Sequence, residues 1–170
     1  IIDIDTSKVR PATSKDAETQ LRIVDSLKHI NCSQVDAWPN DIPVTLVHTF
    51  SIMTWAKNSR KPYGIGMFGK LPSQDMINMA AIVAGGEEEL MKTPRLLGYH
   101  NPVSPLQTSL LLVRGSMVFA KYNQPQIIAP EAQAGSTAPS TLAGLLAQQT
   151  AENLGIITLV ELTNPGAPVL

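Results

Sequence analysis

Short apolar or β-branched runs recur along this chain about every 30 to 40 residues, and this spacing limits the folds open to it. One strand, one crossover helix and their turns occupy about 30 residues or more, the length of a βαβ unit. Between the runs, apolar residues return at helical spacing rather than in alternation. We therefore predict an α/β protein with parallel strands. The expected strands lie at residues 31–35, 63–68, 95–99, 125–129 and 167–170.

Residues typical of helix ends divide the segments between these runs. Thr13 or Ser14 is expected to cap the first helix, with Asp16 in its first turn. Glycine at 85 and 86 favours the end of the third helix, and an Asn-Pro-Gly run at 164–166 favours the end of the last. The other helices are expected from about 44 to 57, from about 71 to 84, from about 87, from about 106 to 117, and from about 139 to 162.

Two architectures contain successive βα units: an open doubly wound sheet and a (β/α)8 TIM barrel. No Gly-x-Gly-x-x-Gly motif follows the first expected strand, and Gly64, Gly66 and Gly69 have the wrong spacing for one. Glycines within a strand favour close backbone approach or barrel curvature, so we favour the barrel.

A closed barrel needs eight strands, whereas about five βα units are visible here. The interpretation is that residues 1–170 are a fragment of a single TIM-barrel domain. An incomplete barrel leaves open strand edges and an uncovered apolar interior. We therefore expect the isolated chain to be marginally stable or to self-associate.

Composition excludes several classes of partner. Charged residues make up 16% of the chain and the net charge is -1, which gives no basic patch for nucleic acid. No apolar run is long enough to span a bilayer and no signal peptide opens the chain, so we expect a soluble, cytoplasmic protein without a membrane partner. Cys32 is the only cysteine, and we expect it to be inert and packed. The histidines, His29, His48 and His100, lack metal-ligand spacing, so no metal site is expected.

The segment after the expected strand at 125–129 is the first place to look for function, because ligands bind where parallel strands end and helices begin. Gly135 tolerates unusual backbone angles, and Ser136 and Thr137 can cap a helix or donate hydrogen bonds. Glu131 and Gln133 can project into a pocket. A βα turn with no further role explains the same residues equally well.

Several ordered motifs resemble those of one enzyme family. They are Asn-Pro-Val-Ser-Pro-Leu at 101–106, Gln-Ala-Gly-Ser-Thr-Ala-Pro at 133–139 with Thr-Leu-Ala-Gly at 141–144, Ala-Glu at 151–152, and Asn-Pro-Gly-Ala-Pro-Val at 164–169. With 10–13 and 41–43 the similarity covers nearly the whole chain. On these residues the chain resembles the trimethylamine and glycine betaine methyltransferase family of corrinoid-dependent enzymes. Ser136, Ser140 and His100 depart from the residues common in that family.

The resemblance implies a reaction and a set of partners. Members of the family move a methyl group from a methylated amine to the cobalt of a corrinoid, which a separate small protein carries. This chain would then bind no cofactor directly, and its partners would be a corrinoid protein and a methylated or quaternary amine. A homo-oligomer is expected for the full-length protein. The pyrrolysine of the trimethylamine branch lies beyond the residues present here.

A site of this kind must desolvate and orient a compact cation, which aromatic faces and a few acceptors can do. The candidate aromatic faces are Tyr99, Phe68 and Trp38, although core packing accounts for the last two as well. Candidate polar contacts are Glu131, Gln133 and Asn101, and His100 is a candidate proton handler. A salt bridge would explain Glu131 structurally, and a satisfied strand-end histidine would explain His100. We expect Cys32, Phe68, Tyr99 and Glu131 to lie near one rim.

Two other functions remain open at this point. The first is a barrel lyase that holds a phosphate at the amides around 135–138 and the helix that follows. The absence of a lysine at an expected strand end weakens this reading, since no Schiff base can form there. The second is an inactive truncated homologue that keeps the fold without the activity.

Overall fold

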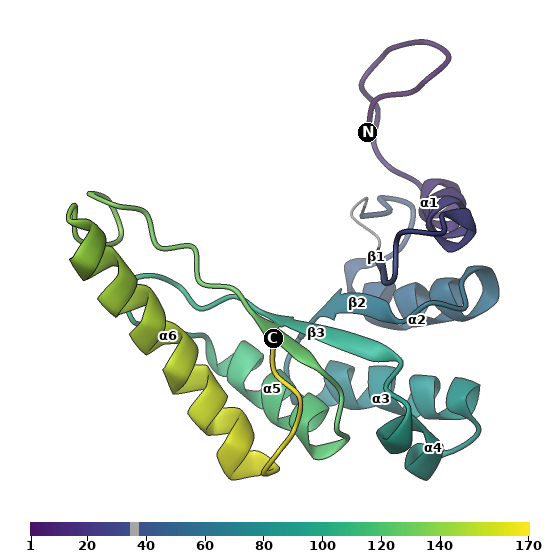
Figure 1. The fold of residues 1–170 in the computed structure, drawn as a ribbon. Helices are drawn as coiled ribbons and strands as arrows, with labels where there is room; N and C mark the ends of the chain where they lie inside the picture. The colour runs from purple at the N-terminus through teal and green to yellow at the C-terminus, as the bar shows by residue number, and fades with distance from the viewer. Residues whose placement is uncertain (35–37) are drawn as a thin grey trace. The chain divides into compact units, whose positions relative to one another are not determined.

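The computed structural model describes residues 1–34 and 38–170, in two compact units, Ile1–Gly64 and Ile65–Leu170 (Figure 1). Both units contain parallel strands and the helices that connect them. The strands follow the chain in the order β1-β2-β3-β4. The predicted strand at 31–35 ends at Val35, which lies outside the described residues.

The first unit contains α1 (Ser14–Ser26), β1 (Ser33–Gln34), the short helix η1 (Val44–Leu46), α2 (Val47–Asn58) and the start of β2 (Tyr63–Gly66). The predicted cap at Thr13 is confirmed, since its backbone N–H donates to the carboxylate of Asp16 at 2.8 Å. β1 and β2 are parallel, with Ser33 opposite Tyr63. The buried Trp55 ring stacks on that of Tyr63 at 6.0 Å between centroids, and its indole N–H donates to the Lys61 carbonyl at 2.7 Å.

The second unit alternates helices and strands. It contains α3 (Lys70–Ala84), α4 (Glu87–Lys92), β3 (Leu96–His100), α5 (Leu110–Lys121), β4 (Gln126–Ile128) and α6 (Leu142–Thr163). β3 and β4 are parallel, with Tyr99 opposite Ile127. Helix α5 contacts both strands and also packs against α3 and α6. Figure 1 shows α3 and α5 on the same side of these two strands.

The end of the chain continues the same pattern. Val169 forms a parallel bridge with Gln126, and the Leu170 N–H donates to the Gln126 carbonyl at 2.8 Å. In return, the Ile128 N–H donates to the Leu170 carbonyl at 3.2 Å. The segment predicted as a strand at 167–170 therefore lies parallel to β4. A mixed α/β fold with parallel βα units is confirmed, and closure into a TIM barrel stays a prediction.

Two predicted helix starts are wrong by several residues. The helix predicted from about 106 to 117 includes Leu106, but this residue lies in a loop with a φ of 53°, and α5 begins at Leu110. Ser109 caps α5 by accepting a hydrogen bond from the Leu112 N–H at 3.2 Å. Similarly, α6 begins at Leu142 rather than near 139, because Thr141 is its cap. In both cases a hydroxyl residue downstream of a proline sets the boundary.

Buried side-chain amides join the layers of the second unit. The Gln124 carbonyl oxygen accepts the backbone N–H groups of Arg95 and Leu96 at 3.0 and 3.1 Å, and its amide donates to the Leu90 carbonyl at 3.1 Å. Gln126, in β4, exchanges two hydrogen bonds with Ser116 of α5, one to its hydroxyl and one to its carbonyl. Because these polar groups are buried and satisfied, they fix the register between the strands and the helices.

We expect Gly115→Ala to destabilise the protein, because α5 has no room for a side chain there. An added Cβ would lie 2.7 Å from Met67 Cβ and 2.9 Å from Ser73 Oγ. Overpacking of this kind costs about 1 to 3 kcal/mol. The matched control is Gly155→Ala in α6, where nothing lies within 4 Å and helix propensity should stabilise by up to about 1 kcal/mol. Urea unfolding of both variants measures the difference, and equal midpoints would contradict the close approach at Gly115.

Candidate functional site

Two loops leave the carboxyl ends of β3 and β4 at the same edge, because these strands are parallel. They comprise residues 101–109 and 129–141. Between them lies a pocket of about 320 Å³, here called the loop pocket. Its lining residues are Asn101, Pro102, Val103, Ser104, Glu131, Gln133 and Thr137. The structure thus brings together all three predicted polar contacts and one residue of the predicted helix-start loop.

Three polar side chains of the loop pocket are available to a ligand. Asn101, Glu131 and Gln133 are all exposed. Within the described residues, none of these side chains makes a hydrogen bond or an ion pair. The salt bridge that could have explained Glu131 is therefore not formed with any described residue. A carboxylate and two amides in this state can accept hydrogen bonds, and the amides can also donate them.

The turn at 133–138 uses its own amides. The Gln133 carbonyl accepts the N–H groups of Ser136, Thr137 and Ala138 at 3.1, 3.1 and 3.0 Å, and the Gly135 N–H donates to the Ala138 carbonyl at 2.9 Å. Gly135 has a φ of 77°, which explains why glycine stands there. The phosphate-binding lyase required these same amides to be free. Their internal hydrogen bonds disfavour that reading.

The buried carboxylate of Glu152, on α6, holds the other loop in place, and sequence reasoning missed it as a site residue. This residue is 5% exposed. Its carboxylate accepts the Ser104 hydroxyl at 2.8 Å, the Leu106 N–H at 2.9 Å and the Gln148 amide at 2.9 Å. Burial alone would raise the pKa of this carboxyl, but the three hydrogen bonds outweigh it and the pKa lies below its usual range. A signal was present, because Gln148 and Glu152 are four residues apart in a mainly apolar segment.

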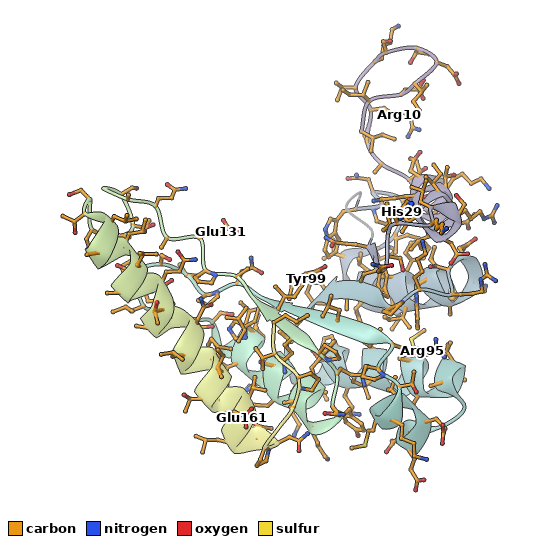
Figure 2. All side chains as sticks on the ribbon, viewed as in Figure 1. Arg10, His29, Arg95, Tyr99, Glu131 and Glu161 are labelled. Carbon is orange, nitrogen blue, oxygen red and sulfur yellow. The ribbon has the colours of Figure 1, made fainter. Side chains whose placement is uncertain are left out.

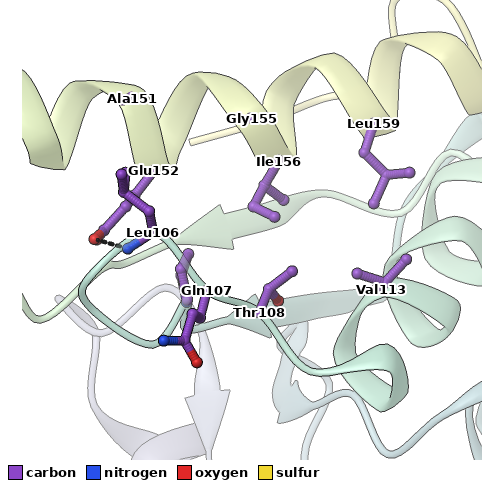
Figure 3. A pocket seen from close by; sticks show the side chains of 10 residues that line it. Leu106, Gln107, Thr108, Val113, Ala151, Glu152, Gly155, Ile156 and Leu159 are labelled. Carbon is purple, nitrogen blue, oxygen red and sulfur yellow. Dashed lines mark hydrogen bonds between the residues drawn. The ribbon is translucent and has the colours of Figure 1, made fainter.

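A second pocket of about 340 Å³ lies between α6 and the first loop (Figure 3). Its walls are mostly apolar, with Leu106, Val113, Ile156 and Leu159 among them. Figure 3 shows the hydrogen bond between Glu152 and the Leu106 backbone at one end of this pocket. The loop that carries Leu106 therefore contributes to both pockets.

The remaining predicted residues lie outside the lining of the loop pocket. His100 is fully buried, and its Nε2 lies 2.8 Å from Thr108 Oγ1. Burial lowers the pKa of this imidazole to about 4. Tyr99 is half-buried and, by strand alternation, faces away from the side of β3 where His100 packs. Figure 2 shows Tyr99 on β3 and Glu131 in the loop after β4. Phe68 is half-buried and lies beside Gly66, since a Cβ added at Gly66 would lie 3.4 Å from the Phe68 ring.

Cys32 and Trp38 belong to the first unit. Cys32 is half-buried, and burial raises the pKa of its thiol, which agrees with the expected inert packing. Trp38 is exposed. The predicted place of Cys32 on the same rim as Phe68, Tyr99 and Glu131 stays a prediction, and so does the role of Trp38 as an aromatic face.

The described residues contain no group of three or more His, Cys, Asp or Glu side chains that could hold a metal ion. In the same part of the chain, every helix is too short or too polar to cross a membrane.

Fold and pocket together define an α/β protein of successive parallel βα units that presents polar side chains where its strands end. Comparison with known proteins places it further. The chain belongs to the trimethylamine methyltransferase (MTTB) family, whose model matches residues 1–170. The resemblance inferred from the motifs is therefore confirmed.

Individual relatives agree with this assignment. A glycine betaine methyltransferase of Desulfitobacterium hafniense (strain Y51) is 34% identical over 171 residues, which cover 100% of this chain and 36% of that protein. A trimethylamine methyltransferase, MttB, of strain DSM 10664 / DCB-2 of the same species is 33% identical over 176 residues, or 100% of this chain and 34% of the relative. Trimethylamine methyltransferase MttB1 of Methanosarcina mazei is 36% identical over 56% of the chain and 19% of its own length. The chain thus spans about a third of the length of the first two relatives.

We expect His100 to make the folded protein less stable as the pH falls. The pKa of its imidazole is about 4 in the folded chain, against 6.5 without burial, so between these values the unfolded chain binds more protons. The stabilisation is complete above pH 6.5 and is lost as the pH falls toward about 4. Urea unfolding should show that the stability deficit of His100→Gln at about pH 7 shrinks by about 2 kcal/mol at about pH 5. A deficit independent of pH would contradict the burial of a neutral imidazole.

Proposed function

We propose that the protein carrying this chain is a methyltransferase that moves a methyl group from a methylated amine to the corrinoid of a separate partner protein. The observation that supports this most is the match of the family model to all 170 residues. Relatives that align over the whole chain are named for glycine betaine and for trimethylamine, so the proposed donor is an amine of one of these two types.

The loop pocket has chemistry suited to such a donor. A quaternary ammonium group has no N–H to donate, so a protein recognises it through its charge and its methyl surface. In our proposal the free carboxylate of Glu131 faces the positive charge, and the amides of Asn101 and Gln133 orient polar groups beside it. Tyr99, which lies on β3 outside the lining of this pocket, is the candidate aromatic face. A quaternary ammonium group, or trimethylamine in its protonated form, carries the positive charge before transfer. The amine then leaves as a neutral molecule, and the reaction needs no metal ion to stabilise an anionic leaving group.

The corrinoid supplies the methyl acceptor when its carrier protein docks. The residues of this chain then have three tasks: to bind the amine, to hold its methyl group toward the acceptor, and to exclude water. The half-buried Thr137 and the buried Pro102 narrow the loop pocket around its polar side chains. A homo-oligomer of the full-length protein remains part of the same proposal.

We expect Glu131→Gln to weaken methyl transfer while leaving folding nearly unchanged, because the substitution removes a charge from an exposed side chain of the same shape. Adding Tyr99→Ala should lower kcat/KM by a further 2- to 30-fold or so, since an aromatic contact to a cation contributes about 0.5 to 2 kcal/mol. The assay follows methylcobalamin formation by absorbance, with trimethylamine or glycine betaine as the donor and reduced corrinoid protein as the acceptor.

Glu88→Gln is the matched control, because Glu88 is an exposed carboxylate of α4, away from the loops. It should transfer methyl groups at the parental rate. If the Glu131→Gln/Tyr99→Ala double variant does so too, these two residues take no part in binding the amine and have only a structural role. A parent protein that transfers no methyl group from either amine would refute the proposed function itself.

A further inference from the structure

We propose that Gln148 and Glu152 are positioning residues that clamp the two loops of the loop pocket in one geometry. These two side chains, here called the α6 clamp, touch both loops from the side of the helix. For its catalytic consequence the inference rests on the proposed function. For its structural content it rests on the contacts of these two side chains alone.

Glu152 holds the loop at 101–109 through two groups. Its Oε2 accepts the Ser104 hydroxyl at 2.8 Å, and its Oε1 accepts the Leu106 N–H at 2.9 Å. Ser104 lines the loop pocket, and Leu106 lines the neighbouring apolar pocket. Apart from the clamp, this loop is closed by the mutual backbone hydrogen bonds of Val103 and Gln107 at 2.7 and 2.9 Å. The carboxylate therefore fixes where the closed loop lies relative to α6.

Gln148 holds the other loop and connects it to the first. Its amide nitrogen donates to the Thr137 carbonyl at 2.9 Å and to Glu152 Oε1 at 2.9 Å. Residues four apart on a helix lie on the same face, so the two side chains reach toward the same edge. Thr137 also accepts the Gln133 N–H on its hydroxyl at 3.0 Å, and both residues line the loop pocket. Gln148 therefore links the Thr137 carbonyl of one loop to the carboxylate that holds the other loop.

The exposure of the loops makes an external support necessary. Residues 103 and 105–107 of the first loop are exposed, and so are 133–136 of the second. Segments with few buried apolar contacts open easily unless polar contacts restrain them. The three polar side chains that face the ligand lie in or beside these segments. Displacement of a binding group by about 1 Å can lower a rate by about 100-fold, so the clamp sets the precision of the site.

Glu152→Gln separates the geometry of the clamp from its charge. The amide oxygen of the new side chain can still accept the Leu106 N–H and the Gln148 amide. Its NH2 group can donate to Ser104 Oγ, because a hydroxyl both donates and accepts. All three contacts therefore survive without the negative charge. Glu152→Ala loses all three, and Gln148→Ala releases only the loop at 129–141.

The experiment compares amide hydrogen exchange and methyl-transfer kinetics in the protein that carries this chain. Glu152→Ala should speed exchange at Leu106 and Gln107 about 10-fold or more, and Gln148→Ala should do so at 136–138. Both should lower kcat/KM about 10- to 100-fold with trimethylamine or glycine betaine as the donor. Glu152→Gln should restore parental exchange and activity to within about twofold. The matched control is Gln149→Ala, the adjacent glutamine, whose side chain makes no hydrogen bond within the described residues.

Each contrary result has a distinct meaning. Exchange in Gln148→Ala equal to that in Gln149→Ala would overturn the clamp, whatever the activity. Glu152→Gln as impaired as Glu152→Ala would show that the charge itself acts, and positioning would be wrong. Parental activity in both alanine variants with fast loop exchange would also overturn the positioning role. Exchange reports on the clamp even where the parent protein transfers no methyl group, so failure of the clamp is distinguishable from failure of the proposed function.

Discussion

A buried carboxylate is the constraint on which the candidate site depends. Removing a carboxylate from water costs several kcal/mol or more unless donors replace the lost hydration. Glu152 obtains those donors from both sides of the first loop turn and from Gln148 on its own helix. The donors must stay in place for the carboxylate to stay buried, so the cost of exposing it restrains the loop. Because Ser104, which this carboxylate holds, lines the loop pocket, the position of the turn sets one wall of that pocket.

Parallel pairing supplies the other half of the arrangement. Since β3 and β4 run in the same direction, both loops begin at the same edge of these strands. Small residues then allow the layers to approach closely, because an added Cβ at Gly98 would lie 2.9 Å from the Phe119 ring. The buried pair of Ser116 and Gln126 fixes β4 against α5. Strand direction therefore decides at which edge of the strands the site lies. The buried side-chain amides decide how the strands align with the helices.

Periodicity and capping chemistry predicted the strands, the helix at Thr13 and the convergence of the loops, because these depend on local sequence and on the rule for parallel strands. The burial of His100 and the contacts of the α6 clamp were not predictable in this way. His100 is buried because Thr108, eight residues later, returns to meet it. The spacing of Gln148 and Glu152 marked a polar pair on one face of the helix, but the sequence could not show that Glu152 binds Ser104 and Leu106, 48 and 46 residues earlier. Leu106 fits the apolar spacing of a helix and was predicted to lie in one. It lies in the loop instead, where its N–H donates to the Glu152 carboxylate.

Two carboxylates with opposite surroundings divide the work of the site. Three hydrogen-bond donors stabilise the negative charge of Glu152 and hold the pKa of its carboxyl below the usual range. This charge is therefore already engaged within the protein. Glu131 is exposed at the same loop edge and has no hydrogen-bond or ion-pair partner among the described residues. A cation that enters the loop pocket therefore meets the free charge of Glu131, whereas Glu152 lies outside the lining of this pocket. Because the engaged carboxylate holds the loop opposite Glu131, the free carboxylate would face the methylated amine of our proposal at a defined distance, which a pair of mobile loops would not provide.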